Sequence, residues 1–284
     1  MPTMTTLELP LPSLSKGRFA SIDALTDEPL FENHGIRIAF TERGGGVGVG
    51  AFASLNLGDQ VGDDSCAVEA NRARLMAAFG ASGLPCVVPR QVHGDRVLVS
   101  GDGGEGGFAA LCAQARQGAD AVVIEGSHTA ALLCFADCVP VIGVSPSGRF
   151  TVVHAGWRGV ANGVAVRALE ALAACDREAG WDCGPPDYNI YIGPHIRSEC
   201  FETAAEPYQR FGEDFGKACL AGAGHVDLAQ ALKTAFGRLG AASRRILDAG
   251  VCTACDNEHY FSYRAQNGVC GRQGAFAIRL AGAS

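Results

Sequence analysis

Residues 150–159 read FTVVHAGWRG. An apolar, largely β-branched run ends at His154 and is followed by Gly, Trp, Arg and Gly, which predicts a buried strand stopping in a turn. A similar run, TAALLCFADCVPVIGVS at 129–145, carries Cys138 just before a Val-Pro pair. The segment PCVVPRQVHGDRVLVS at 85–100 predicts strand, turn and strand, with His93 in the turn. These segments predict strands clustered in the middle of the chain.

The rest of the sequence predicts further elements around this centre. Strands are predicted at 35–43, 118–126 and 189–196, helices at 63–80, 158–176 and 226–240, glycine-rich loops at 44–58 and 101–107, and a hairpin within 259–281. Strands and helices do not alternate regularly, which favours an α+β fold with mixed sheets packed together and helices outside. We expect one domain, residues 35–284, after an N-terminal extension, residues 1–34.

Composition excludes several classes of protein. The chain has 284 residues, of which 48% are apolar, and this is ample for one large core. A net charge of −7 argues against a nucleic-acid or anionic-membrane surface. No window reaches the roughly 18 apolar residues of a membrane span, and residues 1–29 lack the pattern of a signal peptide. We expect a cytoplasmic monomer without nucleic-acid or membrane partners.

The twelve cysteines are spread along the chain, and several lie in apolar runs. This distribution predicts buried free thiols in a reducing compartment rather than a disulfide framework. CTAC at 252–255, with His259 nearby, has the spacing of a zinc or redox site. Because no second C-x-x-C pair exists, a zinc ribbon is not favoured, and we interpret this motif as structural.

His93, Cys138 and His154 share one property, which is a metal-binding side chain at a predicted strand end. Neighbouring strand ends lie close together and are rigidly held, so the three side chains can converge. Three protein ligands leave a fourth position on Zn²⁺ open for water or substrate. Two histidines and one cysteine also hold copper in blue-copper centres. With seven histidines in all and no His-x-His pair, the chain is a poor candidate for a four-copper enzyme.

Four further residues are candidates for substrate or phosphate contacts. Arg43 opens the glycine-rich loop, where backbone N–H groups and a guanidinium suit an anion; the alternative is a loop that only needs positive φ angles. Asn56, in SLNLG, is a substrate contact or a turn residue. Arg158 and Arg264 are phosphate ligands or members of surface salt bridges.

Four motifs, RQVHG, ADCVPV, HAGWRG and IGPHI, occur in this order and resemble the laccase-domain family. That family is also called multicopper polyphenol oxidase-like and, more recently, the peptidoglycan editing factor and purine nucleoside phosphorylase family. The resemblance runs from about residue 35 to 280 and departs at Phe135, where the family commonly has Thr. It implies that His93, Cys138 and His154 bind Zn²⁺ at the active site, and that the chain phosphorolyses purine nucleosides and also deaminates adenosine.

The resulting hypothesis is a zinc-dependent purine nucleoside phosphorylase with an adenosine deaminase side activity. Adenosine, inosine, guanosine and methylthioadenosine are candidate substrates together with phosphate, which Arg43 is expected to help hold. The H-x-E…P-C-x-x-C signature of zinc deaminases is absent, so Asp137 is the candidate for orienting a ligand or moving a proton. The alternatives are a Cys–His hydrolase with Cys138 as nucleophile, a copper-dependent polyphenol oxidase, and a non-enzymatic cell-wall editing partner.

Overall fold

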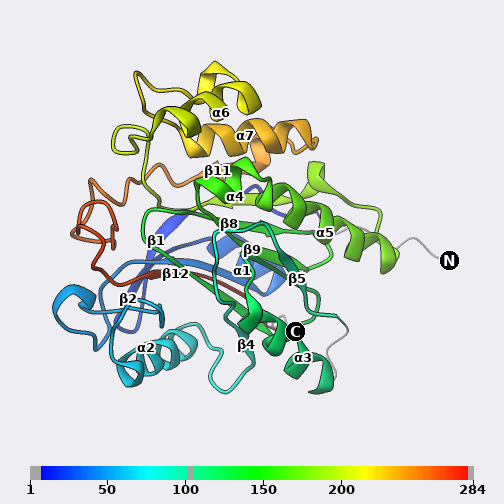
Figure 1. Cartoon of the computed structure of the whole chain (residues 1–284). Coiled ribbons are helices and arrows are strands. Elements are labelled where there is room, and N and C mark those ends of the chain that lie inside the picture. The colour runs from blue at the N-terminus through cyan, green and yellow to red at the C-terminus, as the bar shows by residue number, and fades with distance from the viewer. Residues whose placement is uncertain (1–7, 102–104, 281–284) are drawn as a thin grey trace.

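The computed structural model describes residues 8–101 and 105–280, and it confirms the α+β fold (Figure 1). Two mixed six-stranded sheets lie face to face, with strand orders β1-β2-β3-β12-β7-β4 and β11-β10-β8-β9-β6-β5. The first sheet contains β1 Ser15–Phe19, β2 Ile22–Thr26, β3 Ile36–Thr41, β12 Gln273–Arg279, β7 Ala130–Phe135 and β4 Cys86–Val87. The second contains β11 Ile246–Asp248, β10 Asn189–Ile192, β8 Val139–Val144, β9 Phe150–Ala155, β6 Ala121–Ile124 and β5 Val97–Val99.

The central strands are buried on both faces, which explains their continuous apolar runs. Leu133 and Phe135 of β7 point into the apolar layer between the two sheets. Leu132 and Cys134 alternate with them and point to the outer core, on the side of the helix at 65–78. Side chains of a strand alternate between its faces, so a strand that is covered on both faces has apolar residues at successive positions.

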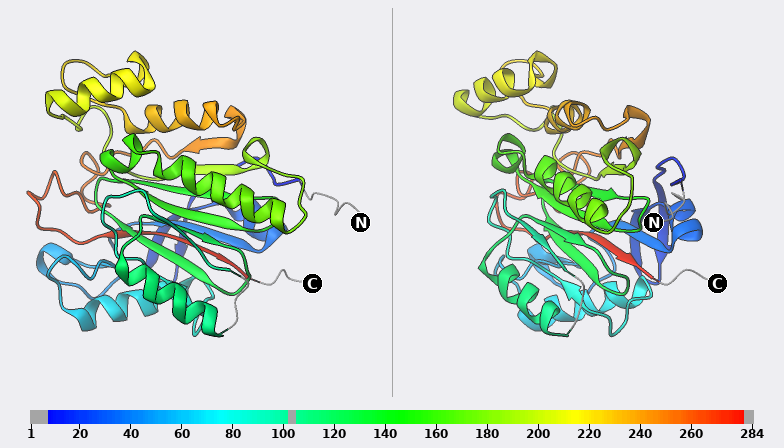
Figure 2. Two further views of the ribbon diagram at one scale, coloured as in Figure 1. Left: turned by 45° about the vertical axis from the view of Figure 1, so that its right-hand side comes forward. Right: turned by 90° about the vertical axis from the view of Figure 1, so that its right-hand side faces the viewer.

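Helices complete the two outer layers (Figure 2). The helices are α1 Glu28–His34, α2 Ser65–Ala78, α3 Glu105–Gln117, α4 Trp157–Ala161, α5 Val164–Glu178, α6 Ala205–Phe215 and α7 Leu228–Arg238, with short 3₁₀ turns at Gly50–Phe52, Pro185–Asp187, Lys217–Cys219 and Ser243–Arg245. Residues of α2 pack on the first sheet, and those of α4 and α5 pack on the second. The helices α6 and α7 pack against α4 and extend the same apolar core. Across the described ranges, none of the helices combines the length and hydropathy of a membrane span.

Several predicted elements are confirmed and others are corrected. The helices at 63–80 and 226–240 form, and the Asp227 carboxylate caps α7 by accepting a hydrogen bond from the Gln230 N–H at 2.8 Å. The helix predicted at 158–176 is split into α4 and α5 because Gly163 takes a φ of 80°. The predicted hairpin at 259–281 is wrong: residues 252–268 form successive turns, and β12 alone enters the sheet, between β3 and β7.

Three segments have structure that the sequence patterns did not predict. The helices α3 and α6 were not expected; α6 contains Pro207 and Gly212, which weaken the helical signal. The strands β1 and β2 lie within the expected N-terminal extension, and β2 pairs antiparallel with β3 of the expected domain. The first sheet therefore runs across the expected boundary at residue 35.

Candidate metal centre

The structure brings His93, Cys138 and His154 together although they lie far apart in the sequence. Their ligand atoms all lie within 4.8 Å of one another. The Cys138 Sγ lies 3.7 Å from the His93 Nε2, and the centroids of the two imidazole rings are 4.8 Å apart in an edge-to-face arrangement. Three lone-pair donors therefore face one small volume.

Two of the ligands lie in connections between strands, and the third lies near the end of a strand. Cys138 lies in the tight turn in which the chain passes from β7 of the first sheet to β8 of the second, and Asp137 in this turn has a φ of 81°. His154 is the last residue but one of β9, and its ring packs on Phe135 with centroids 5.3 Å apart. His93 lies in the loop between β4 and β5, with a φ of 58°.

The Gln91 side chain fixes the loop that carries His93. Its amide nitrogen donates to the Cys134 carbonyl at 2.7 Å, and its amide oxygen accepts from the Cys134 N–H at 2.8 Å. A side chain thus takes the place of a backbone partner beside β7, and the loop is held against the first sheet.

Asp120 connects two of the ligands, and the sequence patterns did not identify it. Its buried carboxylate accepts backbone N–H bonds from His93 at 2.9 Å, from Gly94 at 2.7 Å and, more weakly, from Val92 at 3.3 Å. The same carboxylate lies 2.8 Å from the His154 Nδ1. This contact assigns the proton to Nδ1 and leaves the Nε2 lone pair for the cluster, as carboxylates behind metal-binding histidines do. The only signal in the sequence is one acidic residue at the start of an apolar run.

Gly156 explains why a glycine follows the histidine motif. A Cβ atom at this position would lie 2.8 Å from the His93 ring and 3.2 Å from the Cys138 Sγ. The contact with His93 is too short for any Cβ, so a larger residue would force the His93 ring to move and would crowd the Cys138 sulfur.

The electrostatics of the metal-free cluster favour a thiolate. Burial alone would raise the pKa of Cys138, but the positive charge of His154 and hydrogen bonds from both imidazoles lower it. Burial alone would lower the pKa of His154, but the facing thiolate and the Asp120 carboxylate raise it. Each member of the pair thus favours the charged form of the other, a thiolate facing an imidazolium. A metal ion binds the thiolate and the neutral imidazole, so binding displaces the His154 proton.

The donor set fits a zinc or copper ion. Two imidazole nitrogens and one thiolate match both metals, and three ligands leave a position open. Across residues 8–101 and 105–280, only one other group of at least three potential ligands gathers this closely, and it consists of cysteines alone. The described chain thus offers no histidine cluster for the further coppers of a multicopper oxidase.

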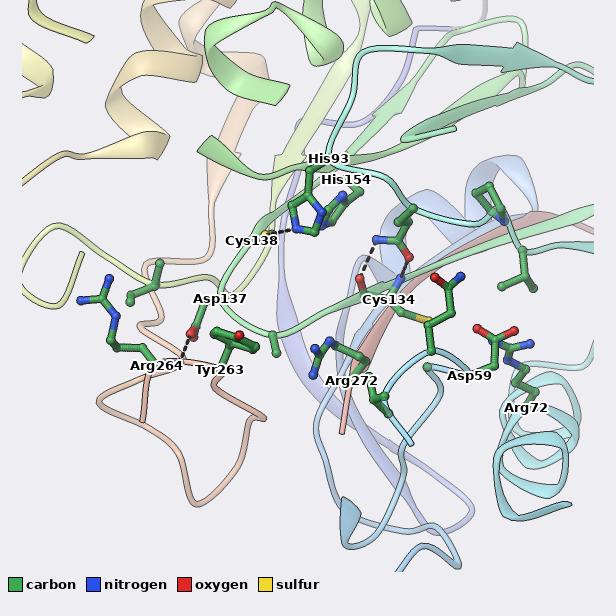
Figure 3. A pocket seen from close by; sticks show the side chains of 18 of the residues that line it. Asp59, Arg72, His93, Cys134, Asp137, Cys138, His154, Tyr263, Arg264 and Arg272 are labelled. Atoms are coloured by element: carbon green, nitrogen blue, oxygen red, sulfur yellow. Dashed lines mark hydrogen bonds and ion pairs between the residues drawn. The ribbon is translucent and has the colours of Figure 1, made fainter. Parts of the chain in front are cut away.

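The three ligands lie in the wall of a cavity of about 470 Å³ (Figure 3). This volume is within the range of sites for small molecules. The apolar part of the lining includes Val61, Val88, Pro89, Ala136, Ile196 and Phe201. The polar part includes Asp59, Arg72, Gln91, Asp137, Tyr263, Arg264 and Arg272.

Asp137 and Arg264 lie in the cavity wall, where the proposed roles need them, but hydrogen bonds within the protein engage both. The Asp137 carboxylate accepts from the Thr253 hydroxyl and from the Arg264 backbone N–H, each at 2.7 Å. The Arg264 guanidinium donates to the carbonyls of Cys200 and Glu202 at 3.1 Å and points away from the imidazoles (Figure 3). Both residues therefore tie the segments of the wall together.

The structure does not bring Arg43, Asn56 or Arg158 into the cavity lining. Arg43 donates to the carbonyls of Ala53 and Asn257 and lies over the Phe261 ring. Arg158 is exposed and lies over the ring of Trp157, its neighbour in the chain.

Asn56 is fully buried behind the wall. Its amide oxygen accepts from the Gly58 N–H at 3.0 Å and from the Arg272 N–H at 2.8 Å. Asn56 therefore positions two segments that line the cavity.

Arg72 and Arg272 place positive charge in the cavity wall, a role that the sequence patterns had assigned to Arg43, Arg158 and Arg264. Arg272 lies 5.9 Å from the Tyr263 ring centroid, and its Nη1 donates to carbonyls of its own loop. Arg72 donates to the Leu57 carbonyl and forms an ion pair with Asp59 at 3.4 Å. Neither was among the candidate arginines, because both reach the cavity only through the folding of distant segments.

Known proteins resemble this chain over nearly its whole length. A relative from Xylella fastidiosa named purine nucleoside phosphorylase is 33% identical over 273 residues, covering 92% of this chain and 97% of that protein. The Escherichia coli purine nucleoside phosphorylase YfiH is 33% identical over 247 residues, or 85% and 93% of the two chains.

Solved structures share the fold. The crystal structure of YlmD from Geobacillus stearothermophilus matches with a TM-score of 0.81 and 27% identity, covering 94% of this chain and 99% of that one. A Bacillus licheniformis hypothetical protein YfiH matches with a TM-score of 0.80 and 26% identity, covering 93% and 98%. The model of the family described as multi-copper polyphenol oxidoreductase laccase matches residues 37–280. The chain therefore belongs to this laccase-like family, whose members include proteins named YfiH and YlmD.

Proposed function

We propose that the chain is a zinc-dependent purine nucleoside phosphorylase. The observation that carries the proposal is the placing of His93, Cys138 and His154 in the wall of a cavity that also contains arginines. A metal position, an anion position and apolar surface within one cavity suit a purine nucleoside and phosphate. The names of the relatives from Xylella fastidiosa and Escherichia coli support the same substrates.

The residues of the cavity take separate roles in this proposal. His93, Cys138 and His154 hold the ion, which supplies a Lewis acid at the reacting end of the cavity. Arg272 holds phosphate in place of Arg43, because its guanidinium lies at the cavity wall whereas that of Arg43 is engaged behind it. Val88 and Phe201 offer apolar surface to the purine ring.

Adenosine deamination at the same centre is the second part of the proposal. Asp137 is a poor candidate for moving the proton, because both its carboxylate oxygens accept hydrogen bonds from Thr253 and Arg264. Asp137 acts by positioning the turn that carries Cys138.

The free thiols at all twelve cysteines suit the reducing cytoplasm, which we propose as the location.

A Cys–His hydrolase is the second candidate. The observation that favours it is the placing of the Cys138 thiol, whose pKa is lowered, beside the imidazoles of His93 and His154. A thiol paired with an imidazole is an activated nucleophile in cysteine hydrolases. Removal of the metal separates the two functions: a hydrolase keeps its activity on chelation, whereas the zinc-dependent phosphorylase loses it.

The test combines elemental analysis with adenosine turnover in the presence and absence of phosphate. We expect zinc in the purified protein, phosphate-dependent release of adenine, and loss of both in His154→Ala. Arg272→Ala is expected to raise the KM for phosphate, and Arg43→Ala serves as the matched arginine control. Inosine formed without phosphate measures the deaminase. Turnover that survives chelation and stops only with a thiol reagent would refute the proposal in favour of the hydrolase.

A further inference from the structure

A second group of potential ligands lies outside the cavity lining and consists of Cys200, Cys252 and Cys255. Their sulfur atoms all lie within 4.8 Å of one another, and the Cys200 and Cys255 sulfurs are 3.3 Å apart. All three are free thiols. The phosphorylase proposal uses none of them.

Two separate segments build this thiol cluster. The turn that contains CTAC carries Cys252 and Cys255, and it is closed by a hydrogen bond from the Asp256 N–H to the Cys252 carbonyl at 2.9 Å. Cys200 comes from a segment 55 residues earlier than Cys255 in the chain. His259, the other ligand that the sequence suggested near CTAC, instead bonds Asp256 through its Nδ1 at 2.6 Å.

The surroundings of the cluster are unlike those of thiols that only fill a core. Cys255 is exposed and Cys200 is half-buried, so ions from solvent reach the sulfurs. The Arg197 backbone N–H donates to the Cys252 Sγ at 3.4 Å. This contact ties the buried Cys252 sulfur to the backbone of the segment that leads to Cys200.

We propose that Cys200, Cys252 and Cys255 form a second metal site, which binds one thiophilic ion such as Zn²⁺. Three thiolates select soft or borderline ions and reject Mg²⁺ and Ca²⁺, which require oxygen ligands. The exposed side of Cys255 leaves the fourth position to solvent, so the ion exchanges more readily than one in a closed four-cysteine site.

The ion joins two segments that also form the cavity wall. Phe201, next to Cys200, lines the cavity. Thr253, next to Cys252, donates its hydroxyl to Asp137 at 2.7 Å. Arg264 donates to the Cys200 carbonyl. Occupancy of the thiol site therefore stiffens this part of the cavity wall, whatever substrate the cavity accepts.

The test loads reduced, metal-free, full-length protein with excess Zn²⁺ and measures zinc per chain after desalting. We expect two zinc ions in the wild type and one in each of Cys138→Ser, Cys255→Ser and Cys200→Ala. Cys66→Ser, which changes an exposed thiol on α2, is the control and keeps two. Because Cys255 is exposed, its variant keeps the fold. X-ray absorption of zinc in Cys138→Ser is expected to show sulfur ligands and no imidazole.

Two results would overturn the thiol site. One is an equal zinc content in wild type, Cys255→Ser and Cys200→Ala. The other is a Cys200–Cys255 disulfide in the protein as purified from cells, seen as a mass lower by two hydrogen atoms that a reductant restores, with no sulfur-only zinc after reduction. Failure of the phosphorylase proposal is seen separately: Cys138→Ser then keeps two zinc ions, or the zinc-loaded wild type turns over no nucleoside.

Discussion

Replacing Asp120 by Asn tests whether one carboxylate organises the whole metal centre. Oδ1 of Asp120 accepts from the His93 N–H and faces the His154 Nδ1, whereas Oδ2 accepts from the N–H groups of Gly94 and Val92. Asparagine has the same shape but turns one of these oxygens into a donor. Whichever way the amide is oriented, two N–H groups then face an NH₂ group and lose their acceptor.

The structure sets the size of the effect. A hydrogen bond to a charged group contributes about 1.5–3 kcal/mol. The amide orientation that loses less places its NH₂ group at the Oδ2 position, where the hydrogen bond from Val92 is already long at 3.3 Å. Losing the bonds from Gly94 and Val92 then costs about 2–3 kcal/mol. At about 1.4 kcal/mol per factor of ten, this loss sets an upper limit of roughly 30- to 140-fold on the rise in the zinc dissociation constant. The part that is lost equally from the metal-free protein lowers its free energy of unfolding instead. Losses of about 10- to 100-fold are usual when the partner of a metal-binding histidine is changed.

The assay is competition for zinc between the protein and a chromophoric chelator, with urea unfolding of the metal-free protein as a check on the fold. Asp95→Asn is the matched control, since Asp95 lies two residues after His93 but forms only an exposed ion pair with Arg167. We expect the control to bind zinc like the wild type. A folded Asp120→Asn protein with unchanged zinc affinity would refute the role given to Asp120.

Three further changes give distinct outcomes. Gly156→Ala is expected to abolish zinc binding at the first site while circular dichroism stays unchanged, because the new Cβ meets the His93 ring at 2.8 Å; Gly126→Ala, in open space, is the control. Burial alone would raise the pKa of Asp248, but hydrogen bonds from Lys233 and a backbone N–H lower it to about 2. The ionised carboxylate therefore stabilises the folded protein by about 2 kcal/mol above pH 4, and this stabilisation is lost as the pH falls toward 2. Urea unfolding at pH 6 and pH 3 is expected to show this loss in wild type and a smaller one in Asp248→Asn. Arg43→Ala is expected to lower the free energy of unfolding by about 2 kcal/mol without changing the KM for phosphate, because its guanidinium bonds backbone carbonyls outside the cavity.

The sequence predicted what local chemistry determines. Apolar runs identified the buried strands, and turn residues marked His93, Cys138 and His154, which the fold brings together. His93 lies within the loop between β4 and β5 rather than at a strand end. The helices at 63–80 and 226–240 followed from apolar spacing and capping residues. These signals depend only on a few neighbouring residues, so they can be recognised in the sequence without knowledge of the tertiary structure.

The missed features depend on contacts between distant segments. Asp120 acts because β6 pairs antiparallel with β9 and the loop after β4 folds back over it. Arg272 enters the cavity because β12 pairs between β3 and β7, whereas the local pattern favoured a hairpin. Arg43 stands in a plausible anion-binding loop, but Asn257, more than two hundred residues away, supplies its partner. No local pattern carries such information.

Two of the three metal ligands lie in connections that join the two sheets, and the third, His154, lies on β9 of the second sheet. His93 lies between β4 of the first sheet and β5 of the second, and Cys138 lies where the chain crosses from β7 to β8. The three side chains therefore meet only after both sheets have formed and packed. Long-range pairings of this kind form late in folding. Tight zinc binding during refolding therefore reports when the tertiary structure is complete. A nascent or half-folded chain binds the ion no more tightly than separate thiols and imidazoles do.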